Sequence, residues 1–227
     1  MDLPASYAEP VTSRTYGQYC PIAHALDVVG DRWNLLILRE LSFGPQRFTD
    51  LRTALAGIAP NLLADRLRDL EDAGVVAREE LPPPAARTVY VLTEAGRDVR
   101  PVLAALARFG ARRLPEPEPG APVRPAAALA AAITAFHDPL AAVDVDELYR
   151  VTIDGRPFDL RCDRGRLRMR PDGAEPDATL EGSSSTLLAI RQGRRTLDDA
   201  VAAGDLTVTG SKRALQHFRR VFAFPPT

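Results

Sequence analysis

Apolar residues in the first third of the chain recur every three or four positions, the spacing that gathers them on one side of an α-helix. Between residues 32 and 74 this pattern predicts three short amphipathic helices separated by Gly and Pro. The third begins with Pro60 in its first turn and stops at Gly74, which is common helix punctuation. Helices this short need a shared core, and a helix-turn-helix unit provides one while holding its second helix outward.

A further helix is predicted over residues 20–29, with Cys20 at its cap and Pro21 in the first turn. After Gly74 the pattern changes to two short strands, at residues 75–80 and 87–92. Residues 81–86 between them are not expected to pair, because three consecutive prolines lack amide donors. A strand, a loop and a strand directly after a recognition helix predict a winged helix, with Arg87 at the base of the wing.

On the predicted recognition helix, Leu63, Leu67 and Leu70 mark the buried side. Asn61 and Arg68 lie on the opposite side, where an amide could pair with adenine and a guanidinium with guanine or phosphate. The alternative for each is an ordinary solvated face, which suits the carboxylate of Asp65 better. The full set of predicted DNA-binding residues is Arg47, Arg52, Pro60, Asn61, Asp65, Arg66, Arg68 and Arg87.

Thr93 is a good N-cap for one long helix that we expect to run to about Leu114. Its apolar stripe is too extensive for a solvated surface, so the helix is expected to pack against a partner. The predicted dimer contacts are Val102, Leu103, Leu106 and Phe109.

Several short motifs follow one another in this half of the chain. They are Cys20-Pro21-Ile22, Gly30-Asp31-Arg32-Trp33, Arg47-Phe48-Thr49-Asp50-Leu51, Leu67-Arg68-Asp69-Leu70-Glu71 and Tyr90-Val91-Leu92-Thr93-Glu94-Ala95-Gly96. With them the chain resembles the HxlR-type winged-helix transcription regulators, a branch close to the MarR type. In that family the first and last helices of the unit build a homodimer. The resemblance therefore implies a homodimer that binds a pseudo-palindromic DNA operator.

Prolines from residue 115 onward indicate a stiff linker, after which the pattern changes again. A helix is predicted at 126–136, then strands with alternating apolar residues that turn at Asp154-Gly155 and at 163–165, the third of them around Leu167 and Met169. Helices at 183–192, 197–203 and 212–222 and a strand at 206–209 complete it. The predicted fold is a mainly α winged helix-turn-helix domain at 1–114, a linker at 115–125, and an α+β domain at 126–227 whose antiparallel sheet is covered by helices on one face.

The order of this second domain is similar to that of the sterol-carrier-protein type of lipid-binding domain. The likeness lies around Asp154-Gly155, Pro176-Asp177-Ala178-Thr179-Leu180, Ser185-Thr186-Leu187-Leu188 and Gly204-Asp205-Leu206-Thr207-Val208-Thr209-Gly210. The resemblance implies an apolar tunnel for fatty or sterol-like molecules. Residues that could line it, each with plain core as its alternative, are Phe136, Phe158, Leu160, Met169, Leu187, Phe218, Phe222 and Phe224.

Charge alone does not favour nucleic acid, because 29 Lys and Arg face 30 Asp and Glu, a net charge of −1. DNA affinity depends on where the arginines sit, so the balance does not exclude it. No apolar run is long enough to span a bilayer, and the N-terminus lacks a signal-peptide pattern. With two cysteines there is no disulfide framework, and we expect a cytoplasmic protein with no membrane partner.

Cys20 is the sharpest chemical candidate, because the partial positive charge of a helix N-terminus lowers a thiol pKa. In some HxlR-type members a cysteine in this place senses oxidants or electrophiles; the alternative is a small buried cap. Cys162 is expected in the sheet core. His24, His137 and His217 are scattered, so no metal site, cofactor or catalytic constellation is predicted, and an enzyme is not expected.

The leading hypothesis is a homodimeric transcription regulator whose C-terminal domain binds a hydrophobic small molecule that changes DNA affinity. One alternative places the input at Cys20 and makes the C-terminal domain a brace. Another is a carrier of lipids or hydrophobic metabolites whose winged helix serves protein contacts.

Overall fold

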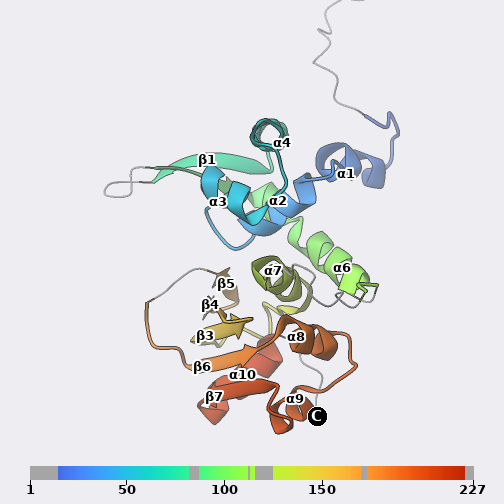
Figure 1. The fold of residues 1–227 in the computed structure, drawn as a ribbon. Coiled ribbons are helices and arrows are strands. Elements are labelled where there is room, and N and C mark those ends of the chain that lie inside the picture. The colour runs from blue at the N-terminus through green and yellow to red at the C-terminus, as the bar shows by residue number, and fades with distance from the viewer. Residues whose placement is uncertain (1–14, 82–86, 112, 116–124, 170–172, 223–227) are drawn as a thin grey trace, which may run out of the picture.

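A computed structural model describes residues 15–81, 87–111, 113–115, 125–169 and 173–222. Figure 1 shows that the molecule has two parts. Short helices and a two-stranded ribbon form the upper part, and a sheet with its helices forms the lower part. Two helices, α6 (Arg100–Ala111) and α7 (Pro125–Phe136), lie between them.

The N-terminal half follows the predicted winged-helix order. Its remaining elements are α1 (Pro21–Val29), α2 (Asn34–Leu41), α3 (Phe48–Ala54), α4 (Pro60–Asp72), β1 (Val76–Leu81), β2 (Arg87–Leu92) and α5 (Glu94–Arg97). Leu63, Leu67 and Leu70 of α4 are fully buried, as the helical spacing predicts, and share one core with Leu51 of α3. Gly74 ends this segment with φ +72°, a conformation that glycine adopts without steric cost.

The wing pairs one residue further than expected. β1 and β2 are antiparallel, and Leu81 pairs with Arg87, so the prediction that Leu81 lies outside the strand is wrong. Leu81 has an amide donor and can close the ladder, whereas the prolines that follow it have none. Those prolines, at 82–84, lie outside the described residues.

The single long helix predicted after Thr93 is two helices. The Thr93 hydroxyl accepts a hydrogen bond from the Gly96 amide (3.0 Å) and caps α5, but α5 ends at Arg97 and α6 starts at Arg100. Pro101 explains the break, because it has no amide to bond to the Arg97 carbonyl and its ring would clash with that carbonyl. Pro101 is visible in the sequence, but the apolar residues on both sides of it have helical spacing, which favoured the prediction of one continuous helix.

The C-terminal half is the α+β unit that the alternating pattern predicted. Its elements are α7, β3 (Asp146–Ile153), β4 (Arg156–Asp163), β5 (Arg166–Met169), β6 (Ala178–Gly182), α8 (Ser184–Arg191), α9 (Leu197–Ala202), β7 (Leu206–Gly210) and α10 (Lys212–Val221). The strands form one sheet in the order β5-β4-β3-β6-β7. Asp154 and Gly155 both have positive φ, as does the pair at 164–165, which is the backbone of tight hairpin turns.

The sheet departs from the fully antiparallel expectation at one place. β3 and β6 are parallel, with Val151 opposite Leu180, while the other pairings are antiparallel. The apolar face formed by Val151, Leu160 and Leu180 packs against α7 and α10, so the helices cover one face as predicted.

The two halves are packed against each other. α6 packs against α7, and Phe43, which follows α2, is buried in the C-terminal core with Leu129 of α7. The Gln192 side chain, just after α8, donates hydrogen bonds to the carbonyls of Leu114 (3.0 Å) and Ala111 (3.4 Å) at the end of α6. Most of the predicted linker, residues 116–124, lies outside the described residues.

Candidate nucleic-acid interface and apolar cavity

The recognition helix α4 lies on the side of the molecule away from the C-terminal sheet (Figure 1). Asn61 and Arg68 are exposed on its outer face, where the helical spacing placed them. Arg68 donates to Asp65 (3.1 Å), and both side chains are at least half exposed. An ion pair this exposed contributes little to stability, and contact of Arg68 with DNA stays a prediction.

Arg66 is placed differently from the other predicted contacts. Its guanidinium pairs with Asp31, in the turn before α2, and with Asp69 (3.2 Å) on its own helix. The side chain is 22% exposed. These ion pairs hold α4 against the turn before α2. Contact of Arg66 itself with DNA stays a prediction.

The other predicted DNA contacts are on the surface. Pro60 is exposed at the first turn of α4, Arg52 is exposed on α3, and Arg87 is exposed at the start of β2. Arg47 caps α3 and lies 4.0 Å from Asp50. Arg78 was not among the predicted contacts; it is an exposed side chain of β1, a strand of the wing, and it donates to Glu71 (2.8 Å).

The predicted dimer stripe divides between two faces of α6. Val102, Leu106 and Phe109 are 48%, 46% and 53% exposed, which is unusual for apolar side chains on one helix face. Leu103 is buried in the N-terminal core of its own chain, so it offers little surface to a partner, and its role in a dimer stays a prediction. The apolar residues of α6 thus cover more than one face of the helix, and one of these faces packs into the N-terminal core of the same chain. On α1, Ile22 and Leu26 are also exposed.

The two cysteines have opposite environments. Cys20 is half-buried at the N-cap of α1, as predicted, and its thiol makes no capping hydrogen bond. Cys162 is fully buried in the sheet core, also as predicted, and burial raises the pKa of its thiol to about 11. Only Cys20 therefore has the exposure that thiol chemistry requires.

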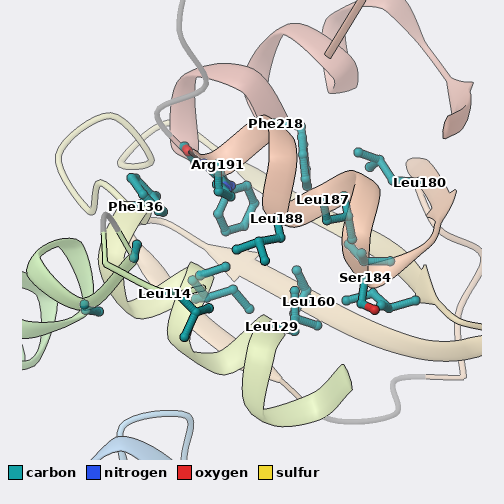
Figure 2. Close-up of a pocket in the computed structure, with 18 residues that line it drawn as sticks. Leu114, Leu129, Phe136, Leu160, Leu180, Ser184, Leu187, Leu188, Arg191 and Phe218 are labelled. Carbon is teal, nitrogen blue, oxygen red and sulfur yellow. Dashed lines mark hydrogen bonds between the residues drawn. The ribbon is translucent and has the colours of Figure 1, made fainter. Parts of the chain in front are cut away.

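An apolar cavity of about 330 Å³ lies between the sheet and its helices. Figure 2 shows the lining side chains converging on it from several elements. They come from α6, α7, the sheet, α8 and α10: Ala107, Gly110, Ala111, Leu114, Leu129, Ala132, Ile133, Phe136, Val151, Ile153, Leu160, Leu180, Ser184, Leu187, Leu188, Arg191, Phe218 and Phe222. The volume is within the range of small-molecule sites, about 300–1,000 Å³.

Five of the predicted lining residues are in this wall: Phe136, Leu160, Leu187, Phe218 and Phe222. Phe158 and Met169 are not in the wall; they share the apolar face of the sheet with Leu160 and pack against the same core outside the cavity. Phe224 lies outside the described residues. Sequence reasoning missed the contribution of α6, since nothing in the alanines at 107 and 111 indicates what they will face.

Three polar side chains of β3 and α10 form a hydrogen-bonded cluster. Glu147 accepts hydrogen bonds from the Tyr149 hydroxyl (2.7 Å) and pairs with His217 (2.8 Å). Burial and the hydrogen bond to Glu147 raise the pKa of Tyr149. The three groups satisfy one another and tie β3 to α10, which is a structural task. Among the described residues there is no group of His, Cys, Asp and Glu that could hold a metal ion.

Fold and site together define a winged-helix transcription regulator that carries an α+β domain with an apolar cavity. Residues 28–118 match the HxlR-like helix-turn-helix family, and residues 131–223 match the SCP-2 sterol transfer family. The chain belongs to the HxlR-like family, and the resemblances that its motifs indicated are confirmed. Its relatives are transcription regulators, so the expectation that it is not an enzyme is also confirmed.

The relatives match the N-terminal part. An HTH-type transcriptional regulator of Synechocystis sp. is 40% identical over 94 residues, which are 41% of this chain and 70% of that protein. One from Mycobacterium tuberculosis is 43% identical over 103 residues, 45% of this chain and 64% of that protein. The solved structure of the reduced form of the regulator YodB from Bacillus subtilis is 30% identical and covers 44% of this chain and all of that one, with a TM-score of 0.39.

Of the helices that the structure describes, none combines the length and apolarity needed to cross a membrane.

Proposed function

We propose that this protein is a homodimer that binds a two-fold DNA operator and changes its operator affinity when a hydrophobic small molecule fills the C-terminal cavity. The observation that carries the proposal is the double role of α6. Ala107 and Ala111 of α6 line the cavity, while Leu106 and Phe109 are exposed and available to a second copy. A dimer face and a ligand face thus share one helix.

The geometry of the dimer links α6 to DNA. A lone winged helix reads few base pairs, so two recognition helices must meet half-sites about one DNA turn, roughly 34–36 Å, apart. A ligand that shifts α6 changes the relation of the two copies and hence this spacing. A second connection runs through α7, which lines the cavity with Ile133 and packs near Phe43 at the end of α2.

A ligand changes the operator affinity only if it binds the DNA-competent and the incompetent arrangements unequally. Coupling of about 1–3 kcal/mol would change the affinity roughly five- to 150-fold. The division into a regulator domain at 1–114, a linker at 115–125 and a ligand domain at 126–227 is part of the proposal. The two family matches, which end at 118 and begin at 131, support it.

The test starts with DNA sequences selected by the full chain from random duplexes. The operator complex is then titrated with long-chain acyl or polycyclic compounds that raise the melting temperature of the protein. An Ala132→Phe variant, which places a ring in the cavity, should lose the response, and Ala203→Phe at the exposed end of α9 is the matched control. Compounds that bind tightly and leave the DNA affinity unchanged would refute the coupling. Failure to bind any DNA would favour the carrier alternative.

A thiol input at Cys20 is the second candidate, and the observation that favours it is the half-buried, uncapped thiol at the start of α1. α1 also carries the exposed Ile22 and Leu26, so oxidation or alkylation there would act beside apolar surface available to a partner. Cys20→Ser separates the two inputs. It should abolish a response of operator binding to quinones or peroxide and leave the response to cavity ligands unchanged.

A further inference from the structure

The cavity is apolar except at one end. Among its described lining residues, Arg191 carries the only formal charge, and Ser184 is the other side chain with a polar group. Figure 2 places Arg191 beside Phe136 at one end of the group of side chains, with Ser184 and Leu180 at the opposite end. A cation at one end of an apolar container is the arrangement that suits an amphipathic anion.

The neighbours of Arg191 hold it in place at the cavity wall. Its Nη1 donates to the Phe222 carbonyl (3.0 Å), and its Cζ lies 4.5 Å from the centre of the Phe136 ring. Burial lowers the pKa of Arg191 to about 10, so the guanidinium stays charged at neutral pH. A guanidinium offers five donors in a rigid fork that matches a carboxylate.

The opposite end of the cavity does not suit an anion. The Ser184 amide at the start of α8 donates to the carboxylate of Asp154 (3.0 Å), and the Thr186 amide donates to the Ser183 hydroxyl (3.1 Å). The amides of Ser184 and Thr186 are therefore already bonded, and Asp154 would repel a second negative group. The charged part of a ligand is best placed at Arg191.

We propose that Arg191 is the residue that determines headgroup specificity in this cavity: it selects ligands with a carboxylate, which it binds, and the alkyl chain of the ligand is directed toward Leu180. This deepens the proposed function and rests on the cavity being the effector site. The volume of about 330 Å³ is at the lower end of the range for ligand sites, which favours one alkyl chain over a bulky polycycle.

The position of the carboxylate also bears on regulation. Arg191 is followed directly by Gln192, whose side chain bonds to the Leu114 carbonyl just beyond α6 (3.0 Å). A carboxylate bound to Arg191 is therefore one residue away from the Gln192 hydrogen bond that holds the end of α6. The headgroup, more than the alkyl chain, is then the part of the ligand that α6 senses.

The experiment compares dodecanoate with dodecanol, two probes of equal chain length, by titration calorimetry on the full chain. Arg191→Gln should weaken dodecanoate binding about tenfold to a hundredfold, the usual effect of losing a hydrogen bond to a charged group, and should leave dodecanol binding unchanged. Arg191→Lys should give a smaller loss, because an ammonium lacks the fork. Arg168→Gln, the same charge change on an exposed residue of β5 outside the cavity wall, is the control.

Dodecanol binding also shows that the cavity remains intact in each variant. Equal weakening of both probes in Arg191→Gln and Arg191→Lys, or no weakening of dodecanoate in either, would overturn the inference. An operator titration then separates this inference from the regulatory one. If dodecanoate binds through Arg191 and the operator affinity does not change, the regulatory proposal fails and the carboxylate site stands.

Discussion

The two halves of this molecule use buried apolar residues for opposite purposes. In the N-terminal half, Leu51, Leu63, Leu67 and Leu70 are fully buried in a core that fixes α4 against its neighbours. In the C-terminal half, the apolar residues of sheet and helices surround a cavity of about 330 Å³. A surface that reads DNA needs a rigid support, whereas a ligand site needs unfilled space between rigid walls. The difference is in packing, since both halves draw on the same side-chain types.

The first prediction tests this difference with one substitution in each half. Leu67→Ala should lower the free energy of unfolding by about 3–5 kcal/mol, because it opens a cavity in a filled core. Leu188→Ala, at the edge of the existing cavity, should cost about 1–2 kcal/mol, since its methyl groups already lack neighbours on one side. Urea unfolding with native-state hydrogen exchange distinguishes the two halves. Equal losses would show that the C-terminal half is as tightly packed as the N-terminal one.

The second prediction concerns the surface of the N-terminal half. Leu106→Glu should raise the dimer dissociation constant by about a hundredfold or more, because two-fold symmetry buries the carboxylate in both copies. Leu140→Glu makes the same change on a side chain that is 83% exposed in the C-terminal half, and should leave association unchanged. Sedimentation at micromolar concentration measures both. A wild-type monomer at that concentration would remove the dimer from the proposal.

The third prediction uses a histidine at the contact between the halves. Burial lowers the pKa of His137 to about 4, with Arg100 lowering it further and Asp138 opposing the shift. In the unfolded chain the pKa of this histidine is near 6.5, so between about pH 4 and 6.5 the unfolded chain binds more protons than the folded one. The contribution of His137 to stability is therefore fully present above about pH 6.5 and is lost as the pH falls toward 4. From pH 7 to 5 the loss should be about 2 kcal/mol.

His137→Gln should remove this part of the pH dependence, and His24→Gln, at an exposed position, should not. Thermal unfolding at closely spaced pH values shows the difference. A His137→Gln protein that loses stability over the same pH range as the wild type would place the titration elsewhere.

The fourth and smallest effect is at the wing. Arg87→Ala should reduce the slope of log affinity against log salt by about one unit, because one phosphate contact is lost, with only a modest change in affinity. Arg166→Ala, an exposed arginine of β5, is the control and should leave the slope unchanged. If both slope and affinity survive Arg87→Ala, then the wing does not contact DNA through this residue.

Local patterns predicted nearly every helix and strand of both halves. The spacing of Leu63, Leu67 and Leu70 placed α4 and its buried side, and Asp154-Gly155 placed the turn between β3 and β4. These features depend on residues a few positions apart, so their physical cause is contained in the sequence segment itself. Even the break before α6 was present locally, in Pro101.

Tertiary packing decided the rest, because the interacting residues are far apart in the sequence. The parallel pairing of β3 with β6 joins strands separated by more than twenty residues, and no local pattern states that partner. Leu103 and Leu106 have equal apolarity, and only the path of α6 over its own core buries one and exposes the other. In the same way, Arg191 reads as an ordinary helix end until α7 and α10 close around it and make it the charged end of a cavity.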